Sequence, residues 1–577
     1  MAANINFKFR FVGLVLLSLP PPIFSYDPPI NTSAFSHTPP ACKSRILHLM
    51  HTGHYKQAFE DYKEHTRQIQ QHDFELLQQL CLLLLEEGAN SSEKEDQLLT
   101  IFGAGICSNE KTLPILIEAL NSPFPQLQIV ALNFIAAQQS REAEEALKGA
   151  LASPFALIRL EAVFQLAKKK SPTAVEQAEA LMYKLDNQLK PIFPQIFAAA
   201  GTPKAMRIFR QLLNDPDEKV RISAIAEATE HNRDDLLMTI RTLSTHLGYA
   251  QQEACAFALG SFKDESAKSK LVKLAASQHK HVQLAACWAL VQIGCPEYQQ
   301  FIMQQAKQGD LFAVQLLGDL DDTEELLATL ATSENLQLRV NAALALLIKE
   351  DPRCIDPLCR DVLLKDARDL AFIAYQSQGK SMEAWRVIPS ASHNLAEEPA
   401  VLALSDKLRE TLLVQIAPLS ETKLLEIAQL IFKKEQNAFL IPVLIKILEN
   451  TRSPECIALL KNHQQKLGAP LVRNYCNLAL FRMKIPGPYG ENLKRWVAQQ
   501  QHKDLIRFKE FDPNSLSNLV SSYELSPEDT SKLLVESLET LAQTQEQDAI
   551  ELILEIIQNG NPHNKYALAG LLMRAIQ

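Results

Sequence analysis

A motif that recurs about every 31 residues limits the folds that this chain can adopt. A full copy has an apolar residue followed by a polar one, such as Val220-Arg221, and a small residue four positions after the first, here Ala224; the copies at Leu189, Ala250 and Phe312 are weaker. The apolar residue falls at positions 127, 158, 189, 220, 250, 282, 312 and 338, in steps of 31, 31, 31, 30, 32, 30 and 26. Such a regular step over seven intervals indicates a tandem array rather than several unrelated domains.

Each copy predicts two amphipathic helices joined by a short polar or Pro-containing turn. In one copy, "KAMRIFRQLLND" precedes the turn and "EKVRISAIAEA" follows it. In the turn, Asp215 can cap the second helix and Pro216 suits its first turn. Asp217 and Glu218 favour the positive end of the same helix. The acidic cluster therefore needs no catalytic explanation, and neighbouring copies must stack because neither helix can bury its apolar face alone.

These residues resemble the HEAT-like repeat family in its short form. The family pattern is a Leu-rich first helix, an Asp-Pro-type turn and then Val-Arg-x-x-Ala-x-x-Ala-Leu. The match is best in the copy with Val220-Arg221, and it extends over residues 111–350, about two fifths of the chain. The resemblance implies an all-α fold, an α-solenoid of stacked antiparallel helix pairs. We extend this expectation from residue 43 to the C-terminus, with no β-sheet.

The Arg of the motif is a candidate structural residue. In HEAT-like folds it bonds turn carboxylates and neighbouring backbone, so that it forms a ladder along the stack. The resemblance places this ladder on four residues of the chain: Arg159, Arg221, Arg339 and Arg473. Three copies depart from the pattern with a glutamine: Gln128, Gln251 and Gln283.

The N-terminal residues 1–25 are predicted to be a signal peptide. A basic start with Lys8 and Arg10 precedes the uncharged stretch "FVGLVLLSL", which Pro20 ends. Nine helical residues span roughly 14 Å, about half of a ~30 Å hydrocarbon core, so this stretch cannot cross a membrane. We expect cleavage after Ser25 and export to a periplasmic or secreted location. Without the cleavage the protein would be cytoplasmic.

The segments around the array are predicted as follows. Residues 26–42, rich in Pro, Ser and Thr, are a linker. Residues 43–110 are a helical cap whose Gly53, Tyr55, Ala58 and Tyr62 resemble half of a tetratricopeptide motif. The HEAT-like array occupies residues 111–355. Residues 356–577 are a helical region of degenerate repeats, in which Val472-Arg473 restores the motif.

Composition and motifs argue against several functions. Only 18 of 577 residues are Gly, which favours helices over antiparallel sheets with their many turns. The net charge of −9, or −11 without residues 1–25, disfavours nucleic acid as a ligand. His48, His51 and His54 are three residues apart, but they match no metal-binding motif, and no cofactor is expected.

Cys354 and Cys359 could form a disulfide in an exported protein, although a buried or free pair is the alternative.

The second helix of several copies carries a second apolar stripe. It occupies positions two, six and nine after the motif's apolar residue: Leu160, Phe164 and Ala167; Leu284, Trp288 and Val291; Val340, Leu344 and Leu347; and, in a smaller version, Ile222 and Ala226. One interpretation is that each second helix is wedged between its neighbours and packs on two sides. The other is that the stripe lines an apolar concave groove for a partner.

The sequence thus predicts a non-catalytic scaffold or interaction module that binds a protein or peptide along a concave face. The predicted contacts are Trp288, Phe164, Ile222, Leu284 and Val340, because large apolar residues often dominate interfaces. The alternative is an enzyme, as the few pigment-attaching lyases among HEAT-like proteins imply. A lyase or transferase would need a reactive residue outside the packing pattern, and Cys42 or a His at positions 48 to 54 is the best placed.

Overall fold

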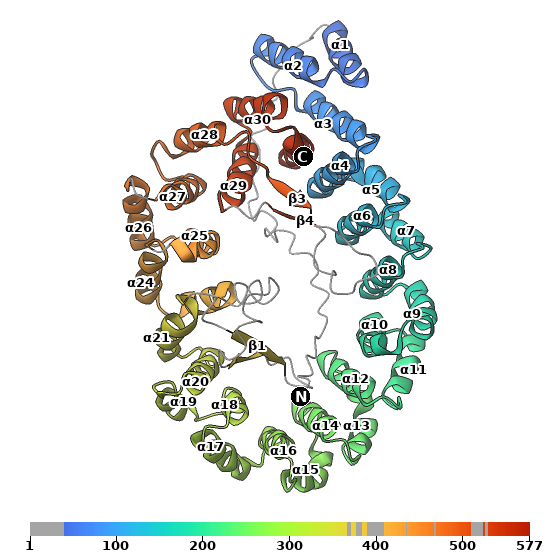
Figure 1. Cartoon of the computed structure of the whole chain (residues 1–577), viewed down its shortest axis with the longest axis vertical. Helices are drawn as coiled ribbons and strands as arrows, with labels where there is room; N and C mark the ends of the chain where they lie inside the picture. The colour runs from blue at the N-terminus through green and yellow to red at the C-terminus, as the bar shows by residue number, and fades with distance from the viewer. Residues whose placement is uncertain are drawn as a thin grey trace, which may run out of the picture. The chain divides into compact units, whose positions relative to one another are not determined.

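The computed structural model describes residues 40–365, 371–376, 383–388, 409–433, 435–466, 469–508, 523–525 and 529–576. Their fold is all-α, as predicted: helix follows helix along the chain, and successive helices pack side by side (Figure 1). The predicted signal peptide, residues 1–25, and residues 26–39 of the predicted linker lie outside the described residues. The first helix begins at Pro40, still within the predicted linker.

The contacts divide the chain into two compact units that do not follow the predicted boundaries. Unit 1 joins residues 1–166 with residues 480–577, and unit 2 comprises residues 167–479. Unit 1 therefore contains both ends of the chain, while unit 2 is one continuous segment between them. The predicted array and the predicted C-terminal region are each shared between the two units.

Unit 1 contains helices from both of its segments, and α8 and α27 straddle its boundary with unit 2. From the first segment come α1 (Pro40–His51), α2 (Tyr55–Ile69), α3 (Phe74–Ala89), α4 (Lys94–Cys107), α5 (Leu113–Leu120), α6 (Pro125–Ala137), α7 (Arg141–Ala150) and α8 (Ala156–Lys168). From the second come α28 (Tyr489–Gln499), α29 (Asp529–Thr544), α30 (Gln547–Asn559) and α31 (Lys565–Ala575).

Unit 2 begins with a regular series of helix pairs. They are α9 (Pro172–Lys184) and α10 (Phe193–Ala200), α11 (Pro203–Leu212) and α12 (Glu218–Glu230), α13 (Leu237–Leu243) and α14 (Tyr249–Ser261), α15 (Lys268–Ala275) and α16 (Lys280–Gln292), α17 (Gln299–Lys307) and α18 (Leu311–Leu317), and α19 (Glu324–Leu330) and α20 (Leu336–Ile348). Then follow α21 (Ile355–Leu358), a helix that includes residues 409–416, α24 (Glu421–Ile431), α25 (Ile441–Thr451), α26 (Pro454–Gln465) and α27 (Pro470–Arg482).

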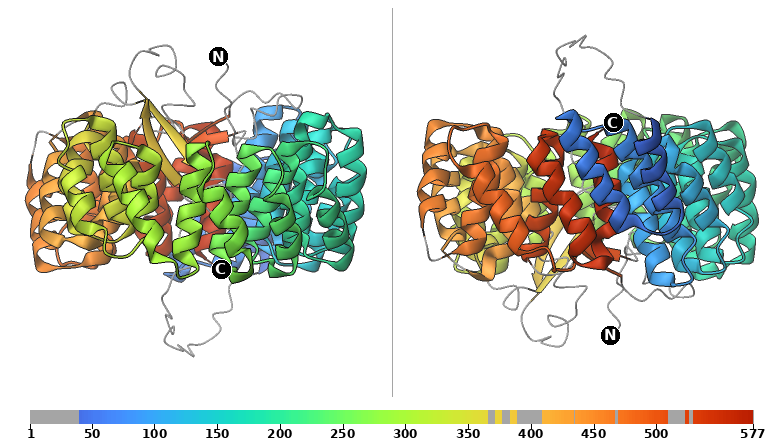
Figure 2. Two further views of the ribbon diagram at one scale, coloured as in Figure 1. Left: turned by 90° about the horizontal axis from the view of Figure 1, so that it is seen from below. Right: turned by 90° about the horizontal axis from the view of Figure 1, so that it is seen from above.

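The paired helices of unit 2 form two rows, which Figures 1 and 2 show with their axes side by side. We call α9, α11, α13, α15, α17 and α19 the outer row, and α10, α12, α14, α16, α18 and α20 the inner row. The second helix of each predicted copy lies in the inner row. The copy that begins at Leu189 is irregular, because residues Asn187–Ile192 form a 3-10 helix and α10 starts only at Phe193.

Two short β-ribbons interrupt the helices, so the expectation of no β-sheet is wrong in detail. Antiparallel strands β1 (Ala371–Gln376) and β2 (Glu383–Ile388) pair with Ala371 opposite Ile388. Strands β3 (Ile506–Phe508) and β4 (Tyr523–Leu525) pair with Ile506 opposite Leu525. The strand sequences "AFIAYQ" and "EAWRVI" are rich in the aromatic and β-branched residues that favour strands. The repeat period had blurred in this region, and the local strand preference prevails there.

In unit 1, the C-terminal helix α31 packs against α3 and α4 of the N-terminal segment. The two backbones come so close that a Cβ on Gly103 of α4 would lie 2.2 Å from the carbonyl oxygen of Tyr566. A Cβ on Gly570 of α31 would lie 2.0 Å from the carbonyl oxygen of Gly103. Between α2 and α30, the buried Lys63 ammonium lies 2.8 Å from a carboxylate oxygen of Glu555. The N-terminal and C-terminal helices that the structure describes in unit 1 therefore share one core.

This close approach gives a test in unit 1. We expect Gly103→Ala to lower the free energy of unfolding by about 1–3 kcal/mol, because the added methyl group overlaps the backbone of α31. The control is Gly149→Ala in α7, where an added Cβ meets no atom within 4 Å. That change should raise stability by roughly 0.5–1 kcal/mol through backbone entropy. Urea denaturation measures both, and equal effects of the two changes would contradict the close contact.

Candidate functional site

Most of the five residues predicted to bind a partner lie in the core. Trp288 is 1% exposed, and Phe164, Leu284 and Val340 are also buried. Ile222 is half-buried. The Trp288 ring packs against Phe257 of α14 with ring centroids 5.2 Å apart.

The surroundings of Trp288 show how the second stripe is used in unit 2. The ring reaches from α16 to the preceding inner-row helix α14, where a Cβ on Gly260 would lie 2.7 Å from it. Phe257 also contacts Phe312 of the following inner-row helix α18, with ring centroids 6.0 Å apart. The burial thus favours the packing interpretation of the stripe over the groove interpretation. A role of these residues in partner binding remains a prediction.

The motif arginines close the turn of their own repeat. In each of three copies, the Arg Nη1 donates to the backbone carbonyl six residues earlier: from Arg159 to Ser153 at 2.6 Å, from Arg221 to Asp215 at 2.6 Å and from Arg339 to Ser333 at 2.5 Å. The same nitrogen reaches the carbonyl five residues earlier in all three copies. For Arg473 the equivalent carbonyl belongs to Leu467, which lies outside the described residues.

Two of the arginines also reach the following repeat of unit 2. The Arg221 Nε donates to the side-chain oxygen of Gln251 at 2.6 Å. The Arg339 Nε donates to a carboxylate oxygen of Asp361, also at 2.6 Å. Burial acts to raise the pKa of Asp361, but hydrogen bonds from Arg360 and Arg339 hold that pKa below its usual value. One side chain therefore fixes both a turn and the neighbouring repeat.

The glutamines that depart from the motif make related bonds. The Gln128 Nε2 donates to the carbonyl oxygen of Ser122, six residues earlier, at 2.6 Å. The Oε1 of Gln128 accepts a 2.7 Å hydrogen bond from Ser153 of the next repeat. Gln251 instead donates to the carbonyl of Leu243 at 2.8 Å. Gln128 thus replaces the arginine in both of its roles, whereas the donated bond of Gln251 stays within its own repeat.

The same geometry identifies a repeat that the sequence analysis missed. In α4, the Gln97 Nε2 donates to the carbonyl of Ser91, six residues earlier, at 2.8 Å. The residue before it, Asp96, lies 31 positions before Leu127, the first copy that was recognised. The pair α3 and α4 is therefore a regular repeat within the region predicted as a cap. The missed signal is the spacing from Ser91 to Gln97, which matches that from Ser122 to Gln128.

The acidic turn in front of α12 is structural, with its caps assigned differently from the prediction. Asp217 is the N-cap, and its carboxylate accepts from the backbone N–H of Lys219 at 2.9 Å. Asp215 closes the turn by accepting from the backbone N–H of Asp217 at 3.0 Å. Its other oxygen lies 2.6 Å from the Lys190 ammonium. The two aspartates are thus occupied in capping and ion pairing, as expected of a structural turn.

The candidate reactive residues do not converge. His48 and His51 are exposed at the end of α1, and the exposed His54 bonds the hydroxyl of Thr52 at 3.1 Å. Within the described ranges, no group of three or more His, Cys, Asp or Glu could hold a metal ion. Cys42 is half-buried, and Cys354 and Cys359 are buried free thiols. Burial raises the pKa of each of these two buried thiols to about 12, so they are poor nucleophiles.

One shallow groove of about 540 Å³ lies between α5 and α7 of unit 1. Ile117 and Leu120 form its apolar side, and Arg141, Glu142 and Glu145 form its charged side. This lining pairs no nucleophile with a base, so it suggests no reaction. No helix in the part of the chain that the structure describes is long and apolar enough to cross a membrane.

Comparisons with known proteins agree with this architecture. The family model for HEAT repeats matches residues 245–312, so the predicted resemblance is confirmed and the chain contains HEAT repeats. A structure of the karyopherin Kap121p, bound to the extreme C-terminus of the phosphatase Cdc14p, is similar at 12% identity and a TM-score of 0.29. The match covers 93% of this chain and 66% of Kap121p, so the chain spans just under two thirds of that protein.

A structure of importin beta is similar at 12% identity and a TM-score of 0.31. This match covers 92% of the present chain and 86% of importin beta. The search of curated proteins gives no match.

The burial of Trp288 gives a direct test of the two interpretations of the second stripe. We expect Trp288→Asp to lower the free energy of unfolding by at least 3–5 kcal/mol, roughly the cost of truncating a buried Trp with a charge added. The control is Met238→Asp on the outer row, where the side chain is 77% exposed and the change should be almost neutral. Thermal melting followed by circular dichroism measures both. A Trp288→Asp protein that melts with the parent would restore the groove interpretation.

Proposed function

We propose that this chain is a non-catalytic scaffold that binds another protein. The observation that carries the proposal is the use of the repeated polar residues. The Arg and Gln side chains of the motif join turns and neighbouring repeats, and the acidic turn residues cap helices. A chain in which most of the repeated polar groups have such a role offers an extended surface rather than a reaction centre.

The five partner contacts expected from the sequence stay a prediction. Four of them are buried in the stacked array, so we propose further contacts on exposed side chains. The candidate contacts are the exposed side chains that the stacking does not use. Stacked repeats bring such side chains from many helices together on one surface, which suits a long protein segment.

The alternative function, a lyase or transferase, has weaker support. Cys42 and the histidines at positions 48 to 54 occupy the first two helices, and His48, His51 and His54 point to no shared pocket among the described residues. An enzyme would turn over a small substrate without a protein partner, whereas a scaffold would not. This difference separates the two proposals experimentally.

The scaffold proposal predicts a defined protein partner. The full chain, immobilised and exposed to extract of its own cells, should retain one or a few proteins in near-stoichiometric amounts. Trp288→Asp serves as a control for unfolded protein, because it should retain only proteins that bind exposed apolar surface. Quantitative mass spectrometry compares the two. If the folded chain enriches nothing beyond this control, the proposal is wrong.

We also propose that the chain is exported. The basis is the basic start and the short apolar stretch within residues 1–25, which end before the described part of the chain. Intact-mass measurement on protein purified from its native cells should give the mass of a chain that starts at Tyr26. A mass that includes residues 1–25 would count against export.

A further inference from the structure

The outer row of unit 2 has an unusual distribution of charge. Helices α11, α13, α15 and α17 contain no acidic residue, although the chain as a whole carries a net charge of −9. The four helices contain eight basic residues: Lys204, Arg207, Arg210, Arg241, Lys268, Lys270, Lys273 and Lys307. A random distribution of an acidic composition would not give four consecutive outer helices of one sign.

Half of these basic residues have structural partners in neighbouring repeats. Lys204 lies 3.2 Å from Glu176, Arg210 lies 2.7 Å from Asp235, and Arg241 forms a 2.5 Å ion pair with Asp264. Lys270 donates to the backbone carbonyl of Arg241 at 2.6 Å. These contacts join consecutive repeats, and they explain why the array keeps the four residues.

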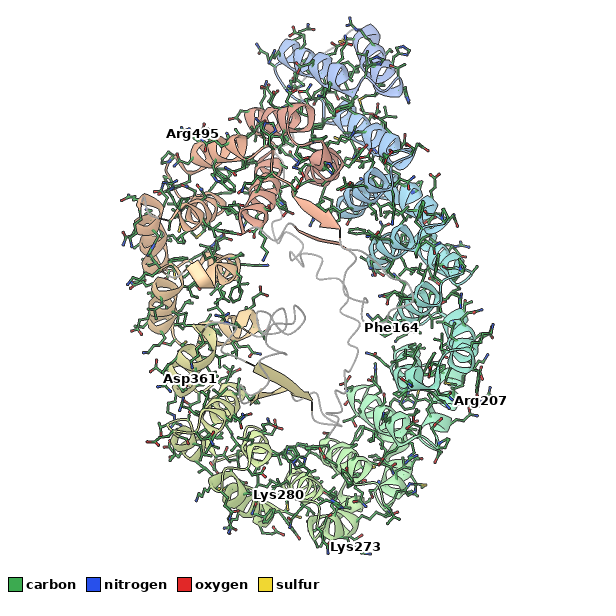
Figure 3. The ribbon with its side chains drawn as sticks, in the orientation of Figure 1. Phe164, Arg207, Lys273, Lys280, Asp361 and Arg495 are labelled. Carbon is green, nitrogen blue, oxygen red and sulfur yellow. The ribbon has the colours of Figure 1, made fainter. Side chains whose placement is uncertain are left out.

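The other half have no carboxylate partner. Arg207, Lys268, Lys273 and Lys307 are exposed, and none of them forms an ion pair with any residue that the structure describes. The pKa of the Lys268 ammonium is raised, chiefly by its interaction with Cys295 and also by the nearby charge of Glu297. Figure 3 shows Arg207 and Lys273 on the outer side of the row, away from the inner helices. We call these four residues the cationic stripe.

Favourable interaction with the helix dipole explains only part of the stripe. Lys273 and Lys307 lie in the last turns of α15 and α17, where a cation stabilises a helix. Lys268, however, is the first residue of α15, where the dipole disfavours a cation. Arg207 lies in the middle of α11, where the dipole has little effect. Local helix stability therefore does not account for the stripe as a whole.

Beside the outer helices α13, α15 and α17, acidic residues lie in the 3-10 turn in front of each helix, while other acidic residues of the region belong to the inner row. Asp234 and Asp235 belong to the 3-10 turn before α13, Glu265 to the one before α15, and Glu297 to the one before α17. There they favour helix N-termini. The stripe is thus bordered by acids along one edge, which would repel an acidic ligand that bound out of register.

We propose, on the basis of the proposed scaffold function, that the cationic stripe binds an extended acidic segment of the partner protein. Packed helices lie about 8–10 Å apart, and an extended chain rises about 3.3 Å per residue. Neighbouring outer helices contact each other less than they contact the inner row, so one step between them corresponds to at least about three residues of an extended peptide. The stripe has members on α11, α15 and α17 and none on α13, so a segment with regularly spaced carboxylates would place charges opposite these three helices.

The exposed apolar residues between the cations favour a peptide over other polyanions. Met238 of α13 is 77% exposed and Val272 of α15 is 40% exposed. A peptide can place apolar side chains against them, whereas the phosphate backbone of a nucleic acid cannot. The overall charge of −9 also repels a long polyanion at a distance, while a short segment responds mainly to the local stripe.

The test uses charge reversal with a matched control in the full chain. The test variant carries Arg207→Glu, Lys273→Glu and Lys307→Glu. The control variant carries Lys433→Glu after α24, Lys446→Glu in α25 and Lys461→Glu in α26, which are also exposed lysines of unit 2 without ion pairs to described residues. Both variants change the net charge by the same amount. Circular dichroism first establishes that both melt with the parent.

The probe is a fluorescent peptide with Glu at every third position and Ser, Ala or Val between. We expect the test variant to bind it at least tenfold more weakly than the parent, because three exposed ion pairs with the peptide are lost and replaced by repulsion. The control variant should change binding less than about twofold, since its charges lie away from the stripe and are screened. Fluorescence anisotropy at low and high salt measures both.

Four results would overturn the inference. Equal weakening by the two variants would mean unspecific attraction, and no binding of the peptide to the parent would remove the site. Binding of phosphatidylserine vesicles or single-stranded RNA that is stronger than peptide binding, and lost in the test variant, would assign the stripe to another ligand. If the test variant still captures the natural partner, the inference fails while the scaffold function stands. If the parent captures no partner at all, it is the scaffold function that fails.

Discussion

The backbone carbonyls of the turn inside each repeat are the constraint on which this architecture depends. A chain that reverses direction between two packed helices leaves carbonyl groups without helical partners, and burying one unpaired costs about 1–3 kcal/mol. The motif places a long polar side chain six residues after such a carbonyl, as with Arg221 and Asp215. The same Arg221 also donates to Gln251 in the next repeat, so one side chain both closes a turn and joins two repeats. Because each repeat needs such a side chain at the same place, the motif recurs about every 31 residues.

This constraint explains which parts of the fold were predictable. The helix pairs and the all-α class follow from the spacing of the motif, since each copy carries its own turn signal. The repeat formed by α3 and α4 was missed because Asp96 stands where the other copies have an apolar residue, although the bond from Gln97 to Ser91 is the same. In this repeat, the six-residue spacing between the turn carbonyl and the polar side chain therefore identifies the repeat, whereas the apolar residue of the motif does not.

The predicted partner contacts show what sequence periodicity cannot predict. An apolar stripe indicates that one face of a helix is buried, but it does not indicate whether neighbouring repeats or a partner protein bury it. An inner helix such as α16 has its own outer helix on one side and inner neighbours on two others, so most of its circumference is apolar. Trp288 packs on Phe257 for this reason. The packing of α4 against α31 in unit 1 could not be predicted from the sequence either. Gly103 and Gly570 form a contact between residues far apart in the sequence, and no local pattern predicts such a contact.

Since stacking occupies the apolar stripes and the motif's polar residues, specificity has to come from positions that the repeat leaves open. On the inner row even a polar position is used internally, as the 3.1 Å bond between Gln315 and Asn341 shows. On the outer row, one set of cations joins the repeats, and another set forms no ion pair with the described residues. Because different cations carry out these two roles, the cations without ion pairs can change to suit a ligand while those that join the repeats keep the array stable. An acidic chain with one local cationic stripe also discriminates well, because its overall charge repels polyanions in general, while the stripe attracts one segment of the right length and register.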